Sequence, residues 1–107
     1  MKKALVCASL ALGLLASSTS AFAYSSTGKS FTDSWTKYDS GTTWVIEYGF
    51  NDSAINEDFT HTKHDTKHHT AVVKNNNGSF ADEDSAQSWA GIEVTHNGST
   101  IYYYINY

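Results

Sequence analysis

The chain has 107 residues, and its seven lysines and eleven acidic residues give a formal net charge of −4 at pH 7. The chain has no arginine and is acidic overall. The composition therefore supports neither nucleic-acid binding by phosphate neutralisation nor binding of anionic lipid by a cluster of basic residues. The length suits one compact domain, and the single cysteine excludes an intrachain disulfide.

The first 23 residues have the pattern of a cleaved secretory signal helix. Two lysines precede an apolar run over 4–16, and Ala21-Phe22-Ala23 is a small-x-small cleavage site. The run is shorter than the roughly 20 residues that span a bilayer, which disfavours the alternative of an uncleaved anchor or stable membrane insertion. Cleavage would remove Cys7 and release an extracellular chain, 24–107, with a net charge of −6.

The secreted part has the composition of a β protein. It is rich in Trp, Tyr and Thr and contains no proline, which suits uninterrupted strands joined by polar turns. We interpret residues 24–40 as a Ser/Thr-rich extension that forms either a mobile tail or a weak edge strand. Residues 41–107 carry the stronger patterns, and we expect them to form a β-sandwich domain.

Two strands are predicted in the first part of this domain. The segment 42–50 alternates as a half-buried strand does, with one face made of Trp44, Ile46, Tyr48 and Phe50. A polar loop is expected over 51–59. A second strand is predicted over 67–75, where it ends in the turn sequence Lys74-Asn75-Asn76-Asn77-Gly78.

Acidic residues cluster at 57–58 and at 82–84, and we expect both clusters to be solvated loop charges. Neither has the alternating oxygen ligands and central glycine of a calcium-binding loop.

The end of the chain predicts a β-hairpin. Asn97-Gly98 stands between two alternating segments and is typical of a type I′ turn. The resulting register places apolar residues opposite one another on the core face: Val94 with Ile101, Ile92 with Tyr103, and Ala90 with Ile105. With the two strands before it, this hairpin predicts an all-β fold, a small antiparallel β-sandwich or barrel.

Three blocks of this domain resemble the lactococcin 972 family of secreted bacteriocins. They are Gly41-Thr42-Thr43-Trp44 with Tyr48-Gly49, the segment 67–77, and Trp89-Ala90 followed by the aromatic end 102–107. The resemblance implies a small antiparallel β-sandwich that inhibits related Gram-positive bacteria by contact with a cell-wall precursor at the septum. It implies no catalytic residue. The extension 24–40 and the acidic charge are departures from the family.

Four histidines lie close together in the sequence: His61, His64, His68 and His69. Zinc would need three or four imidazole or carboxylate ligands converging on one point, with Asp65 as a further candidate. On one extended strand, however, His64 and His68 would share a face and His61 and His69 the other. We therefore keep three alternatives, which are a metal site, a pH-dependent charged surface, and a solvated polar strand.

The non-core face of the predicted hairpin is our candidate for target binding. It would carry Trp89, Glu93, Tyr102 and Tyr104. Exposed rings on a flat sheet suit a sugar, interfacial lipid or a second protomer in a homodimer. The alternative is that these rings form a second core layer or are covered by residues 24–40.

The sequence carries no signature of an enzyme. No nucleophile-elbow motif surrounds any serine, and no cofactor motif is present. We therefore expect a secreted, non-enzymatic antibacterial protein whose partner is a component of the target cell envelope. The competing hypothesis is an exported carbohydrate- or cell-wall-binding module without killing activity.

Overall fold

A computed structural model describes residues 21–107. The predicted signal peptide therefore lies outside the described residues, except for its last three. The described part contains eight strands: β1 (Ala21–Ser25), β2 (Trp35–Ser40), β3 (Trp44–Asn51), β4 (Glu57–His64), β5 (His69–Asn75), β6 (Gly78–Asp84), β7 (Ala90–Thr95) and β8 (Tyr102–Asn106).

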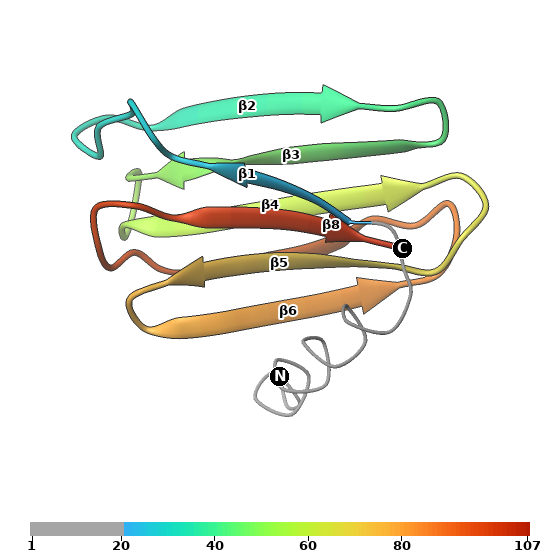
Figure 1. Ribbon diagram of the computed structural model, residues 1–107. Helices are drawn as coiled ribbons and strands as arrows, with labels where there is room; N and C mark the ends of the chain where they lie inside the picture. Colours follow the sequence, from blue (N-terminus) through green and yellow to red (C-terminus); the bar gives the residue numbers. More distant parts are fainter. Residues whose placement is uncertain (1–20) are drawn as a thin grey trace.

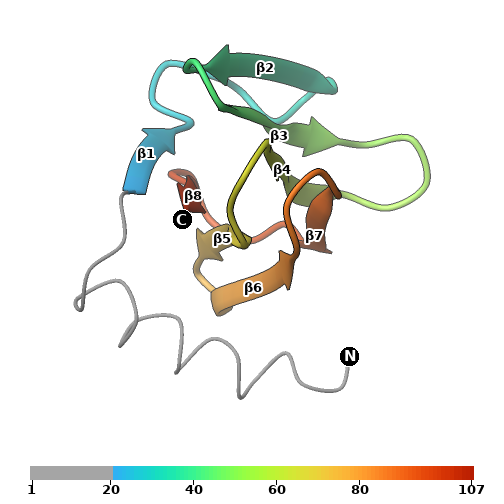
Figure 2. The ribbon, with the colours of Figure 1, turned by 90° about the vertical axis from the view of Figure 1, so that its right-hand side faces the viewer.

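The strands form two four-stranded antiparallel sheets that pack face to face. Sheet A has the order β1-β8-β5-β6, and sheet B has the order β2-β3-β4-β7 (Figure 1). Figure 2 looks roughly along the strands and shows the two sheets as separate layers. The predicted all-β antiparallel sandwich is confirmed. Between residues 21 and 107 no helix is long and apolar enough to cross a membrane.

Strand β3 confirms the alternation predicted for 42–50. Ile46, Tyr48 and Phe50 are buried against sheet A, whereas Glu47 lies on the opposite face and is partly exposed. The extension 24–40 does contain the edge strand of sheet B, because β2 pairs only with β3. Strand β1 also belongs to the sandwich, because it pairs with β8 in sheet A.

The predicted terminal hairpin is wrong. Strand β7 pairs with β4 in sheet B, with Thr60 opposite Ile92, whereas β8 pairs with β1 and β5 in sheet A. The Asn97-Gly98 segment is therefore an arch that carries the chain from one sheet to the other. The apolar faces of the two segments were predicted correctly, because Val94 and Ile101 both contribute to the core, but from opposite sheets.

Other parts of the chain hold this arch in place. The Asn97 carbonyl accepts a hydrogen bond from the Asn76 amide at 3.0 Å, and the His96 amide donates to the Asn56 carbonyl at 2.9 Å. At its far end, the Ile101 amide donates to Ser26 Oγ at 2.8 Å. Because these partners are distant in sequence, a reading based on local turn signals does not detect them.

Strand β4 is the largest departure from the predicted elements. It occupies the end of the expected loop 51–59 and the start of the histidine segment. Its inward face is polar throughout, and Asp58, Thr60, Thr62 and His64 are all buried. Thr60 Oγ1 donates to the Val72 carbonyl at 3.0 Å, so part of this polar face is satisfied across the core. Residues 82–84 likewise belong to strand β6 and not to a loop.

Aromatic rings and branched aliphatic side chains fill the space between the sheets. The buried cluster consists of Ile46, Tyr48, Val73, Ile101, Tyr103 and Ile105. The rings of Tyr48 and Tyr103 meet at 4.8 Å between centroids, and Trp35 packs edge-on against both. Such contacts add to the free energy gained by burying the rings, which compensates for the absence of a disulfide.

Candidate functional site

The structure separates the four residues predicted to form one binding face. Glu93 on β7 and Trp89, which directly precedes this strand, lie on the outer face of sheet B. Tyr102 and Tyr104 lie on the outer face of sheet A, where they alternate with the buried Tyr103. Because the outer faces of a sandwich point in opposite directions, these two pairs cannot contact one ligand. The four residues were assigned to one face because the predicted hairpin would have paired β7 directly with β8.

The four clustered histidines are also separated, because a turn divides them between β4 and β5. His61 faces outward from sheet B, whereas His64 and His69 are buried at 2% and 1% exposure. His68 lies in the turn and pairs with Glu83 at 2.9 Å. Among residues 21–107 no group of three or more His, Cys, Asp or Glu side chains is arranged to hold a metal ion.

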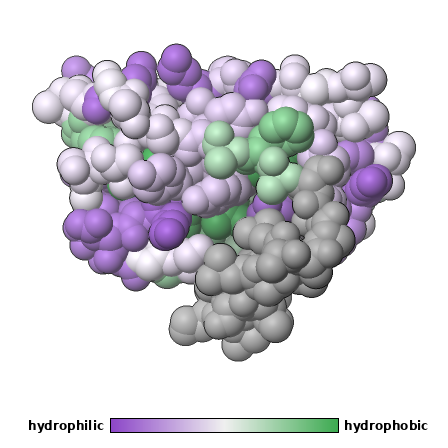
Figure 3. Space-filling model, viewed as in Figure 1, coloured by the Kyte–Doolittle hydropathy of each residue, from purple (hydrophilic) through white to green (hydrophobic). Residues whose placement is uncertain are grey.

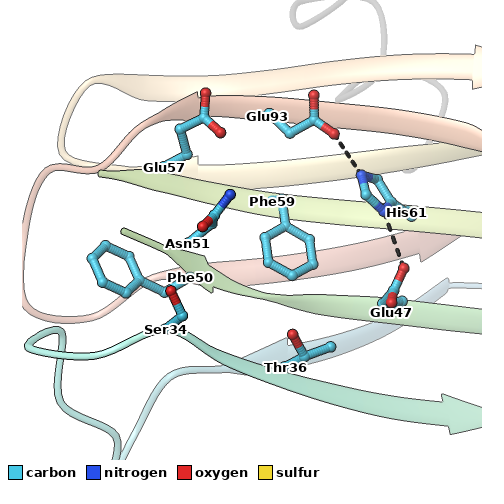
Figure 4. Close-up of a pocket in the computed structure, with 9 residues that line it drawn as sticks. All are labelled: Ser34, Thr36, Glu47, Phe50, Asn51, Glu57, Phe59, His61 and Glu93. Carbon is cyan, nitrogen blue, oxygen red and sulfur yellow. Dashed lines mark hydrogen bonds and ion pairs between the residues drawn. The ribbon is translucent and has the colours of Figure 1, made fainter. Parts of the chain in front are cut away.

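His61 stands at the centre of a hydrogen-bonded row on the outer face of sheet B. Its Nδ1 lies 3.1 Å from Glu47 Oε1 on β3, and its Nε2 lies 2.6 Å from Glu93 Oε2 on β7. Figure 4 shows the imidazole between the two carboxylates. Since a carboxylate only accepts, both hydrogen bonds are made together only when the ring carries a proton on each nitrogen.

The pKa values around this row follow from the same contacts. Burial alone would lower the pKa of His61, but the hydrogen bonds and negative charges of Glu93 and Glu47 outweigh it, and the pKa is raised. Glu47 is also the cross-strand partner of Tyr38, and its carboxylate raises the pKa of the Tyr38 hydroxyl. The hydrogen-bonded row therefore joins three strands of sheet B, namely β3, β4 and β7.

A glycine on β7 makes room for the imidazole. Gly91 is the cross-strand partner of His61, and a Cβ atom at Gly91 would lie 2.9 Å from His61 Cδ2. That distance is shorter than carbon atoms tolerate, so any side chain here would push the ring aside. Glycine at this position lets His61 lean over β7 to reach Glu93.

Beside the row lies a hollow of about 290 Å³. Phe59 forms part of its floor, and its ring lies 5.2 Å from the His61 ring between centroids. The nine lining residues are Ser34, Thr36, Glu47, Phe50, Asn51, Glu57, Phe59, His61 and Glu93 (Figure 4). None of these nine is a lysine or an arginine, so three carboxylates face one imidazole and the hollow is acidic.

Two strongly exposed rings flank this site along the same face. Tyr38 on β2 is 68% exposed, and Trp89, which directly precedes β7, is 50% exposed. The Lys63 ammonium lies 5.9 Å from the Trp89 ring centroid, in cation–π contact. The outer face of sheet B thus presents a row of acidic and hydroxyl groups between two aromatic rings.

The sequence indicated only part of this site. Trp89, Glu93 and His61 were singled out, but they were assigned to different surfaces. Glu47 and Gly91 were not singled out, and Glu57 was expected to be a solvated loop charge. Their grouping depends on the pairing of β3, β4 and β7, which no local motif specifies.

The arrangement has the chemistry of a binding surface for polar ligands. Carboxylates accept hydrogen bonds from hydroxyl and ammonium groups, and exposed rings pack against the apolar faces of sugars or peptides. In comparisons with known proteins, no family model, no curated protein and no solved structure matches this chain.

Proposed function

We propose that this protein is a secreted, non-enzymatic antibacterial protein that binds a cell-envelope component of target bacteria through the outer face of sheet B. One observation carries this proposal, namely the acidic hollow beside His61, on a sheet face that also exposes the rings of Tyr38 and Trp89. The resemblance to lactococcin 972 proteins supports a cell-wall precursor as the target. The signal-peptide pattern supports action outside the producing cell.

Binding explains the polar row better than catalysis does. A general acid or base needs a pKa near the working pH and free access to the reacting group. Both nitrogens of His61 are instead occupied by Glu47 and Glu93, and these contacts favour the charged imidazolium. A fixed cation between two anions orients the carboxylates for a ligand, and the sheet beneath them is rigid.

The charge of the hollow defines the ligand chemistry. The three negative charges of Glu47, Glu57 and Glu93 outnumber the single positive charge of His61. A ligand that presents an ammonium group together with hydroxyl groups is therefore favoured over an anionic ligand. Amino sugars and lysine-containing peptides both have this chemistry. Phe59 and Trp89 supply apolar surface for the rest of such a ligand.

The test compares two exposed aromatic residues on opposite sheets. Trp89→Ala removes a ring beside the proposed site, and Tyr102→Ala, at 41% exposure on β8, is the matched control. We expect Trp89→Ala to weaken binding to isolated cell walls by about tenfold or more, as loss of a central aromatic contact does. Tyr102→Ala should bind as the unaltered protein does. Binding is measured by co-sedimentation with purified cell walls.

The same proteins added to growing indicator bacteria separate the two candidate functions. Growth arrest by the unaltered protein, weakened in Trp89→Ala, supports an antibacterial protein. Cell-wall binding without arrest supports a binding module that does not kill. If Tyr102→Ala loses binding and Trp89→Ala keeps it, the site lies on sheet A and the proposal is wrong.

A further inference from the structure

Strand β1 lies across the predicted signal-peptide cleavage site. It is the edge strand of sheet A and pairs with β8, with Phe22 opposite Ile105 and Tyr24 opposite Tyr103. Cleavage between Ala23 and Tyr24 would divide this strand into two parts. The consequences depend on how firmly each part is attached.

The part after the cleavage site is firmly attached. The Tyr24 ring stacks on Tyr48 at 5.1 Å between centroids, and the Tyr24 hydroxyl donates to Asp39 Oδ2 at 2.5 Å. Ser26 is buried, and its amide and hydroxyl make two hydrogen bonds with the backbone of Ile101. Tyr24 therefore keeps its place on β8 after cleavage.

The part before the cleavage site is held on the surface. Ala21, Phe22 and Ala23 are all exposed, Phe22 at 41%, and apolar atoms gather over β1 in Figure 3. Besides the backbone pairing, Phe22 stacks on Trp44 at 4.6 Å and on Tyr107 at 6.3 Å between centroids. Removing these three residues uncovers both rings and leaves the backbone of 104–106 as an unpaired edge.

We propose that the processed protein carries a strand-acceptor site at this edge, formed by the backbone of 104–106 and the rings of Trp44 and Tyr107. Its ligand is an extended peptide with an aromatic residue between two small residues, which pairs antiparallel to β8. The chain itself shows the fit, because Ala21-Phe22-Ala23 occupies the site in this structure. The inference rests on export and processing in the proposed function.

The new terminus adds a charge to this site. Hydrolysis adds water across the Ala23–Tyr24 amide and leaves a carboxylate on Ala23 and an α-ammonium group on Tyr24. A peptide that occupies the place of Ala21-Phe22-Ala23 brings its own carboxyl end next to that ammonium group. The site therefore prefers a peptide that ends in a free carboxylate. Unpaired edges bind strands through the main chain, and side-chain pockets add the specificity.

The experiment uses the processed chain 24–107 and, as the matched control, the chain 21–107, in which the site is occupied by the protein's own residues. The probe is the synthetic peptide of residues 18–23 with a free carboxylate. We expect it to shift the amide resonances of 104–106 and to change tryptophan fluorescence in 24–107, with no effect on 21–107. The same peptide carrying Phe22→Gly, or ending in a carboxamide, should bind about tenfold more weakly or worse.

Two results would overturn the inference. One is a folded 24–107 chain whose edge amides do not respond to the peptide. The other is failure of 24–107 to fold, as judged by circular dichroism, which would make residues 21–23 a permanent part of the sheet. Trp89→Ala should leave peptide binding unchanged, so the strand-acceptor site and the cell-wall site fail or succeed separately.

Discussion

Asp58 shows how much one buried residue organises in this protein. Its carboxylate is fully buried and accepts from Asn75 Nδ2 at 2.9 Å and from His96 Nδ1 at 2.8 Å. The His96 ring in turn packs on Phe31, with centroids 4.2 Å apart. Asp58 thus joins β4, the end of β5 and the arch to the segment that precedes β2.

Replacing Asp58 by alanine should destabilise the fold strongly. Asp58→Ala leaves His96 and Asn75 without their shared acceptor in a buried place, and we expect a loss of about 3–5 kcal/mol in the free energy of unfolding. The matched control is Glu83→Ala, which breaks an exposed carboxylate–histidine pair and should cost less than about 1 kcal/mol. Urea unfolding followed by tryptophan fluorescence measures both, and equal losses would contradict the role given to Asp58.

His64 is held in its neutral form by its hydrogen bonds. Its Nδ1 accepts from the backbone amides of Thr66 and Lys67 at 3.1 and 3.0 Å, and its Nε2 lies 3.3 Å from Thr43 Oγ1. Burial, with the nearby charges of His69 and Lys67, lowers the pKa of His64, and Asp65 only partly opposes this effect. Protonation at Nδ1 would remove an acceptor that two amides share.

The lowered pKa of His64 predicts a loss of stability in acid. Its contribution is complete above the unfolded-state pKa of 6.5 and is lost as the pH falls below it, because the unfolded chain then binds more protons. His64→Asn keeps an acceptor for the two amides but does not titrate. We expect this variant to lose less unfolding free energy than the unaltered protein between about pH 7 and pH 5.

The matched variant is His68→Asn, which makes the same exchange of histidine for asparagine at the exposed turn position. An identical slope of stability against pH in His64→Asn would contradict the assignment. His61 acts in the opposite sense, because its raised pKa gives stability that is complete below 6.5 and is lost at higher pH.

At the scale of elements, the sequence predicts most reliably those strands whose inward faces are apolar. The 42–50 alternation gives β3 with its correct faces, and the Asn-rich turn correctly ends β5, whereas β6, which begins at Gly78 with a φ of 130°, was not predicted. In both cases the deciding interactions are local. Side-chain alternation and turn conformation need no knowledge of distant partners.

Side-chain alternation and turn signals could not predict strand β4 or the arch. The inward side of β4 is polar and its outward side carries Phe59, so its pattern is the reverse of the expected one. The Asn97-Gly98 sequence suits a hairpin as well as an arch, and Gly98 has a φ of 111° in the arch. Only contacts with Asn76, Asn56 and Ser26 decide between them. The residues of the candidate site were assigned to different surfaces for the same reason, because their grouping depends on pairing between strands that are distant in sequence.

Strand pairing can be tested directly by NMR. We expect backbone nuclear Overhauser effects between Phe59 and Glu93 and between Val73 and Tyr103, which are neighbours within the two sheets. A hairpin would instead give backbone contacts between Ile92 and Tyr103. Facing sheets lie about 10 Å apart, so those contacts should be absent. Their presence would contradict the two-sheet topology.

At the scale of the whole molecule, the sandwich is closed along one side by side chains rather than by a covalent link. The edge strands β1 and β2 belong to different sheets, and the hydrogen bond from Tyr24 to Asp39 joins them. The Tyr24–Tyr48 and Phe22–Trp44 stacks lie on the same side of the fold. Packed rings thus supply cohesion of the kind that many small extracellular proteins obtain from cysteine pairs.

The place of β8 in sheet A has a consequence for how this chain comes to be folded. Strand β8 lies between β1 and β5 in sheet A, so β1 gains its partner only after the six strands from β2 to β7 have been synthesised. Contacts of such long sequence separation form slowly. Sheet A of a growing chain therefore stays incomplete until β8 has been synthesised, and the residues of β1 and β5 lack this shared neighbour until then.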